Sequence, residues 1–230
     1  MKLPAHSPHP PTEDSVAKRV TLLDAMRSRP LAAAASLMTL LFFTSCSLKQ
    51  PHIEKQTYLL DVSRTAAGRA TAHPASLQIR NVSITPPFDG RGFVHRTSNL
   101  AYSTDFYHEF LTPPATQIEA QLQSWLTASK VFRNVLPSRN ATLATHALDI
   151  QITTLHADVR SPSAAQVIIE AQVLVTDQRP LPPVIAFRKS YHHQAPLADQ
   201  RAETLMRGWS QSLAALFTAL ENDLASHHWP

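Results

Sequence analysis

The sequence contains little glycine, a single cysteine and no concentrated charge. Among its 230 residues are four glycines, eighteen prolines and one cysteine, Cys46. So few glycines argue against glycine-rich loops that cradle phosphates, and no Gly-x-Ser-x-Gly nucleophile turn is present. The many prolines indicate stiff connections and extended tails. The composition therefore favours a packed globule without the common nucleotide-binding or hydrolase motifs.

The basic character of the chain is concentrated before an apolar run. The net charge is +4, with a pI near 9.5. Residues 1–45 contain five bases and three acids, so the remaining chain carries a net charge of +2. That remainder has no run of bases that could follow a phosphate backbone. Nucleic acid is therefore not an expected partner.

Apolar and small residues run from Leu31 to Ser45, about fifteen positions, whereas a membrane-spanning helix needs about twenty. Basic residues precede the run, and small residues follow it, as in a secretory signal. The sequence Phe-Thr-Ser-Cys at residues 43–46 matches a bacterial lipobox, although leucine is more usual than Phe43. We expect residues 1–45 to be a lipoprotein signal peptide and Cys46 to carry a diacylglycerol, with a further acyl chain such as palmitate. A cleaved signal with a chance cysteine, or an uncleaved anchor, are the alternatives.

Two further predictions concern this N-terminal region. Ser47 follows the cysteine where aspartate would retain the protein in the inner membrane, so we expect the periplasmic face of the outer membrane of a Gram-negative cell. Met26 begins a complete, compact signal, which predicts that translation starts there; a long signal starting at Met1 is the alternative. Residues 46–56 are polar and predict a flexible tether before a domain at 57–230.

Within that domain the pattern predicts strands, a helix, more strands and a final helix. Apolar alternation predicts a bulge at Asn81 and a long hairpin formed by the sixth and seventh strands. The predicted strands are 57–62, 76–85, 93–98, 100–105, 131–136, 145–159, 165–177 and 183–194. A capping Thr112 and two prolines predict a helix to about Ser129. An amphipathic helix is predicted over 197–225. We therefore predict a single α+β domain, with a mixed or mainly antiparallel sheet and two long helices on one face.

Candidate chemistry is sparse. The adjacent pairs His192-His193 and His227-His228 are the visible metal candidates, but neighbouring strand residues point to opposite faces. No cysteine or carboxylate at ligand spacing accompanies them, so exposed histidines are favoured over a metal site. We predict no cofactor, no metal and no enzymatic activity. A Cys–His nucleophile is excluded if Cys46 is acylated.

The segment 101–114 is unusually rich in aromatic residues. Its aromatic and acidic residues lead directly into the first predicted helix. One interpretation is a strand-to-helix joint whose aromatics close the core; the other is a partner-binding surface, since tyrosine is common at interfaces. The candidate surface residues are Tyr102, Asp105, Tyr107, Glu109 and Phe110.

Taken in order, these features resemble the ABC-type transport auxiliary lipoproteins, which include the lipoprotein of the paraquat-inducible lipid-transport system. The resemblance runs from about Tyr58 to Ala225 and rests on the early YLLDV strand, the block at 77–111, the first helix and the terminal helix. It implies a non-enzymatic role beside an MCE-domain periplasmic protein, an ABC permease and an ATPase, in lipid transport between membranes. It also allows a homo-oligomer.

Two other functions stay open at this point. One is a structural outer-membrane lipoprotein acting in envelope assembly or peptidoglycan attachment. The other is a periplasmic enzyme whose site has no familiar motif.

Overall fold

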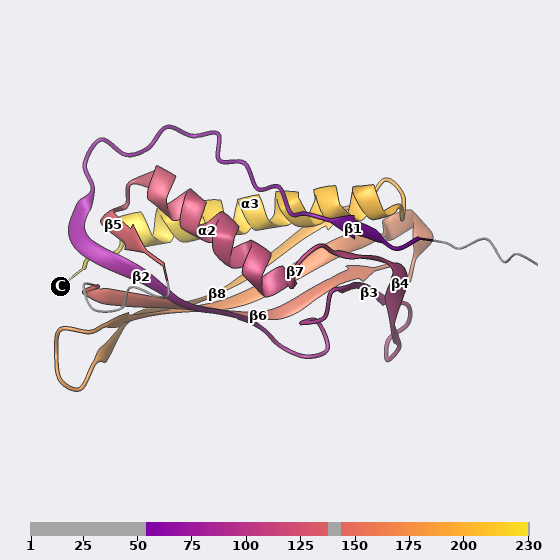
Figure 1. The fold of residues 1–230 in the computed structure, drawn as a ribbon, viewed down its shortest axis with the longest axis horizontal. Coiled ribbons are helices and arrows are strands. Elements are labelled where there is room, and N and C mark those ends of the chain that lie inside the picture. The colour runs from indigo at the N-terminus through magenta and orange to yellow at the C-terminus, as the bar shows by residue number, and fades with distance from the viewer. Residues whose placement is uncertain (1–53, 138–143, 230) are drawn as a thin grey trace, which may run out of the picture. The chain divides into compact units, whose positions relative to one another are not determined.

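In the computed structural model, the described residues, 54–137 and 144–229, form a sheet covered on one face by two helices (Figure 1). The predicted signal peptide, Met26, Cys46 and most of the tether lie outside the described residues. The strands are β1 (Gln56–Tyr58), β2 (His73–Ile84), β3 (Gly92–Arg96), β4 (Tyr102–Phe110), β5 (Phe132–Leu136), β6 (His146–Asp158), β7 (Gln166–Asp177) and β8 (Val184–Pro196). The helices are α2 (Pro114–Ser129) and α3 (Ala202–Ser226). The predicted α+β class is confirmed.

Strand β6 is the centre of a mixed sheet. Along one edge it pairs antiparallel with β7, and β7 pairs antiparallel with β8. Along the other edge it pairs in parallel first with β2 and then, at His95↔Ala157, with β3. Beyond β2 lies β5, and beyond β3 lie β4 and then β1. The sheet therefore divides into two branches on this side, because β2 leaves β6 after Ile84 and β3 takes its place.

Both helices bury one apolar stripe against the same face of the sheet (Figure 1). The α3 side chains of this stripe are at most 1% exposed, and they recur at helical spacing: Leu205, Trp209, Leu213, Leu216, Phe217, Leu220 and Leu224. Helix α2 buries Ile118, Leu122 and Leu126 in the same core. The opposite face of the sheet carries no helix among the described residues. None of the described helices is both long and apolar enough to span a membrane.

Most of the predicted elements are confirmed. The bulge in β2 occurs between Ile79 and Asn81, and the β6–β7 hairpin turns through a short 3₁₀ helix at Pro162–Ala164. Three boundaries were wrong. Strand β4 continues to Phe110, five residues beyond the predicted end at Asp105. Helix α3 begins at Ala202, five residues later than predicted, because the Asp199 carboxylate accepts the Arg201 amide in a non-helical turn. Helix α2 is preceded by Pro113 at the cap position, and Thr112 does not cap it.

The predicted strand at 57–62 was also wrong beyond Tyr58. Leu60 and Val62 are buried, which produced the apolar alternation, but they pack against the helices and not within the sheet. The Leu60 amide donates to Gln117 Oε1 on α2 at 2.8 Å, and the Asp61 amide donates to Ser210 Oγ on α3 at 3.2 Å. Side chains of the helices therefore replace a strand partner. We call residues 59–72, which link β1 to β2 across the helices, the strap.

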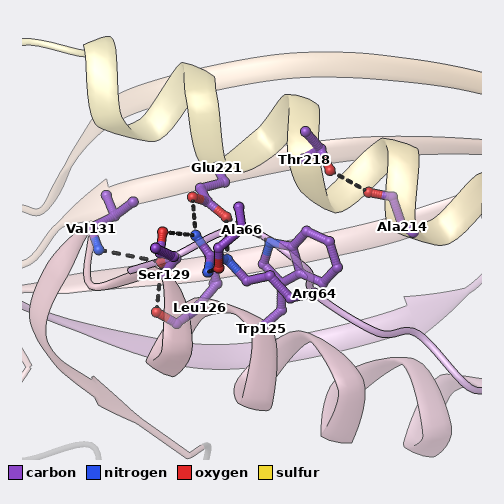
Figure 2. A network of polar contacts seen from close by, with 10 residues as sticks. Arg64, Ala66, Trp125, Leu126, Ser129, Val131, Ala214, Thr218 and Glu221 are labelled. Atoms are coloured by element: carbon purple, nitrogen blue, oxygen red, sulfur yellow. Dashed lines mark hydrogen bonds and ion pairs between the residues drawn. The ribbon is translucent and has the colours of Figure 1, made fainter. Parts of the chain in front are cut away.

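An internal ion pair fixes the strap to both helices (Figure 2). The Arg64 guanidinium donates to both oxygens of Glu221 on α3, at 2.9 and 2.8 Å. The Trp125 indole N–H on α2 donates to the same carboxylate at 2.9 Å. The Arg64 and Glu221 side chains are only 7% and 11% exposed. The bond from Arg64, which outweighs the opposing effect of burial, lowers the pKa of Glu221, so the carboxylate stays charged.

Candidate functional site

A wide bulge interrupts strand β4 in the middle of the predicted surface. Gly92 on β3 pairs with Glu109, but Val94, two residues later, pairs with Thr104. Four residues of β4, 105–108, therefore stand opposite the single residue Phe93. A Cβ atom on Gly92 would lie 2.8 Å from the Asp105 carbonyl oxygen, so this close approach requires glycine.

The Asp105 side chain holds the bulge together. Its Oδ1 accepts the backbone N–H groups of Tyr107 at 2.8 Å and His108 at 3.1 Å. Its Oδ2 lies 2.8 Å from His108 Nδ1. Partial burial acts to raise the pKa of Asp105, but these hydrogen bonds outweigh it and lower the pKa below its usual value. Asp105 is therefore a charged structural residue of the bulge.

The bulge presents two aromatic rings to solvent. Phe106 is 67% exposed and Tyr107 is 41% exposed, and their ring centroids lie 5.3 Å apart in an edge-to-face arrangement. Lys55 Nζ lies 4.6 Å from the Phe106 ring centroid, within cation–π range. We call Phe106 and Tyr107 the aromatic knuckle.

The five predicted surface residues do not form one patch. Phe110 is 2% exposed and packs on Phe93 and Trp209, so it belongs to the core, as the first interpretation of this segment expected. The Glu109 carboxylate lies 2.9 Å from an Arg91 nitrogen and 3.7 Å from Lys55 Nζ. Asp105 closes the bulge. Of these five residues, only Tyr102 and Tyr107 are exposed, at 43% and 41%.

Tyr102 lies on the helix-free face, away from the knuckle. Its ring meets His156 edge-on at 5.4 Å, and Phe88 stacks on the same imidazole at 5.6 Å. His156 pairs directly with Ile168, whose strand neighbours Val167 and Ile169 belong to the helix-covered core. Directly paired residues share a face, which places His156 and the rings over it opposite the helices.

The buried His156 predicts a pH dependence of stability. It is 3% exposed, neither ring nitrogen has a hydrogen-bond partner among the described residues, and burial lowers its pKa. As the pH falls, His156 therefore binds its proton near pH 6.5 in the unfolded chain and only at a lower pH in the folded protein. We expect the free energy of unfolding to be constant above neutral pH and to decrease between pH 6.5 and 5. Urea unfolding at several pH values across this range measures the decrease. In a His156→Phe variant the free energy of unfolding should depend less steeply on pH, and the same slope as in the wild-type protein would contradict the role of His156.

A second prediction concerns the bulge. Asp105→Ala leaves the N–H groups of Tyr107 and His108 without their acceptor, so we expect about 1–2 kcal/mol of destabilisation and faster hydrogen exchange at these two amides. Asp105→Asn keeps the Oδ1 acceptor and should preserve most of the protection. Hydrogen exchange measured by NMR distinguishes the two variants. Equal exchange in both would show that the carboxyl group does not hold the bulge.

Beside the bulge lies an open pocket of about 340 Å³. Its lining includes Tyr58, His95, Asp105, His108 and Glu203. A carboxylate bonded to a histidine is the orienting half of a hydrolytic triad, but the lining includes no serine, threonine or cysteine for that histidine to activate. Burial and the nearby Glu203 and Asp105 charges raise the pKa of Tyr58, which keeps its hydroxyl protonated. The lining therefore does not complete a Ser-, Thr- or Cys-based triad.

The predicted histidine pairs lie apart from this pocket. His192 Nδ1 lies 3.0 Å from Glu170, whereas His227 packs edge-on against Phe187 and Trp229. Within the described residues, no three His, Cys, Asp or Glu side chains are arranged to hold a metal ion.

Sequence reasoning missed the residues that build the site around Tyr107. His108, Lys55 and Arg91 were not predicted, because their roles depend on a bulge and on the pairing of β1 with β4. One signal was available: Asp105 precedes its two backbone donors by two and three residues, the spacing of an Asx turn.

The α+β fold and the order of its elements agree with the family that the sequence resembles. The chain matches the family described as the ABC-type transport auxiliary lipoprotein component over residues 58–221, and it belongs to this family.

Solved structures share the fold at low sequence identity. Protein XCC0632 from Xanthomonas campestris is 14% identical, with a TM-score of 0.64, covering 72% of this chain and 92% of that protein. A second, uncharacterized protein is 15% identical, with a TM-score of 0.58, covering 74% of this chain and 99% of that protein. No curated protein matches the sequence.

Proposed function

We propose that this chain is a non-enzymatic, lipid-anchored component of an MCE-type ABC system that moves lipids between membranes. The observation that carries the proposal is the position of the lipobox cysteine, twelve residues before the region that matches the auxiliary lipoprotein family. Such a spacing joins an anchor to a folded domain through a short tether. Energy would come from the partner ATPase, since the chain lacks a phosphate-binding loop.

In this proposal the lipid on Cys46 holds the domain at the periplasmic face of the outer membrane. Several acyl chains on one residue hold a protein on a bilayer far more firmly than one chain does. The folded domain then captures the end of the MCE-domain assembly. No chemical step is required of the domain in this proposal.

We place the partner contact around Tyr102, at the corner of the helix-free face. The ring is 43% exposed, and it rests on His156 and beside the Arg96 guanidinium, 5.8 Å from its centroid. A tyrosine supported from beneath loses little conformational freedom on binding, and it can contribute both buried area and a hydroxyl. Tyr102→Asp should therefore reduce recovery of the partner, whereas Leu181→Asp, at a 96% exposed position on the β7–β8 turn, should leave it unchanged.

The anchor is tested by the mass of the mature N-terminal peptide. We expect this peptide to begin at Cys46 with diacylglycerol and an amide-linked acyl chain, and Cys46→Ser to release the protein from the membrane fraction. Separation of the inner and outer membranes then tests the location. An unmodified cysteine, or a Cys46→Ser variant that stays membrane-bound, would overturn the anchor.

A further inference from the structure

Four exposed apolar side chains follow the edge where β1 pairs with β4. Leu59 is 60% exposed and Leu111 is 45% exposed, and at the other end of the pairing the knuckle rings of Phe106 and Tyr107 are 67% and 41% exposed. Leu111 donates its N–H to the Tyr58 carbonyl, which brings Leu59 and Leu111 to the same end of the paired strands. We call these four residues the apolar rim. Single exposed apolar residues are common, but a group of four on one edge indicates a contact.

The rim is also where the tether joins the domain. Lys55, the residue just before β1, contacts both Phe106 and Glu109. Lys55 lies nine positions after Cys46, a span of at most about 30 Å in an extended chain. A lipid on Cys46 therefore confines this edge to the neighbourhood of the bilayer. The anchor therefore gives the rim a high effective concentration at the bilayer surface, so even a weak affinity of the rim for the bilayer would be effective.

Two basic side chains lie at the rim. Lys55 and Arg91 are both within ion-pair distance of the Glu109 carboxylate, and the Asp105 carboxylate lies in the adjacent bulge. The Lys55 and Arg91 side chains are 47% and 42% exposed, so both remain partly open to solvent. Aromatic rings flanked by basic residues are typical of the headgroup region of membrane proteins.

We propose that the apolar rim, Leu59, Phe106, Tyr107 and Leu111, rests in the headgroup region of the bilayer that holds the lipid of Cys46. This inference rests on the proposed lipid anchor. The bulge supplies a structural reason for the knuckle, since the hydrogen bonds of Asp105 fix two aromatic rings outside the core. The contact sets the orientation of the domain: β1 and β4 face the membrane, and the β7–β8 turn faces away.

The test uses full-length lipidated protein in vesicles of phosphatidylethanolamine and phosphatidylglycerol. Because Cys46 is the only cysteine and its thiol is acylated in this proposal, Phe106→Cys and Leu181→Cys each supply one thiol for a bimane label. Leu181 is the matched control: it is an exposed apolar residue on the turn between β7 and β8, at the other end of the sheet from β1 (Figure 1). Vesicles carry a spin-labelled lipid with the quencher near the headgroups.

We expect the label at position 106 to be quenched about twofold or more, with emission at shorter wavelength, and the label at 181 to be unaffected. Equal quenching at the two positions would overturn the inference. The inference would also be overturned if the label at position 106 stayed exposed to water in vesicle-bound protein and became shielded only after a partner protein was added. Flotation separates the two proposals: wild-type protein that does not float with vesicles overturns anchor and rim together, whereas floating protein with equal quenching overturns only the rim.

Discussion

Trp209→Ala is expected to lower the free energy of unfolding by about 4 kcal/mol. The Trp209 side chain is fully buried on α3, and its ring centroid lies 5.0 Å from Phe93 on β3 and 5.6 Å from Phe110 on β4. It is the contact through which the terminal helix holds the branch of the sheet that carries the knuckle. Alanine would leave a cavity among rings that cannot collapse into it. Urea unfolding monitored by circular dichroism measures the loss.

The matched control is Trp209→Phe. It retains an aromatic ring between Phe93 and Phe110, and it removes an indole N–H that has no hydrogen-bond partner among the described residues. The expected loss is therefore only about 1 kcal/mol. Losses of equal size in the two variants would show that the ring contacts are not what joins α3 to β3 and β4.

Arg64→Met is expected to cost about 3 kcal/mol. The substitution keeps much of the side-chain volume but leaves the Trp125 indole as the one hydrogen-bond donor to the Glu221 carboxylate among the described residues. An uncompensated carboxylate at a mostly buried position is unfavourable, so the strap should also separate from the helices. Urea unfolding gives the stability. Hydrogen exchange at the Leu60 and Asp61 amides reports the release of the strap.

A double-mutant cycle isolates the ion pair. Arg64→Met combined with Glu221→Leu removes both charges, so the double variant should lose clearly less stability than the sum of the two single losses. Losses that simply add would contradict a coupled pair and would assign the effect of Arg64 to packing and to its bonds with the strap carbonyls.

The elements whose apolar residues recur at a regular period could be predicted from the sequence. The alternation along β6 and β7 and the α3 stripe were correct because each element buries one face along its whole length. The strap was assigned wrongly, because Leu60 and Val62 show the same alternation whether they pack in a sheet or between helices. Alternation reports burial, and only the partners decide whether a backbone is a strand.

The candidate site could be predicted only in part. The segment around Tyr102 and Tyr107 was recognised from its composition, and both rings are exposed. The sequence could not separate them from the buried Phe110, because the bulge at Asp105 changes the alternation within one strand. The apolar rim was not predicted at all, since Leu59 and Leu111 are 52 positions apart and are brought together by the pairing of β1 with β4.

Cross-linking in cells tests the central claim, a binding role in lipid transport, most directly. A photoreactive amino acid in place of Tyr102, in the full-length protein, would capture whatever contacts the helix-free corner, and mass spectrometry of the detergent-solubilised product would identify it. The account predicts an MCE-domain protein, with the same substitution at Leu181 as the negative control. Efficient capture of only cell-wall or envelope-assembly proteins would contradict it and would favour a structural lipoprotein.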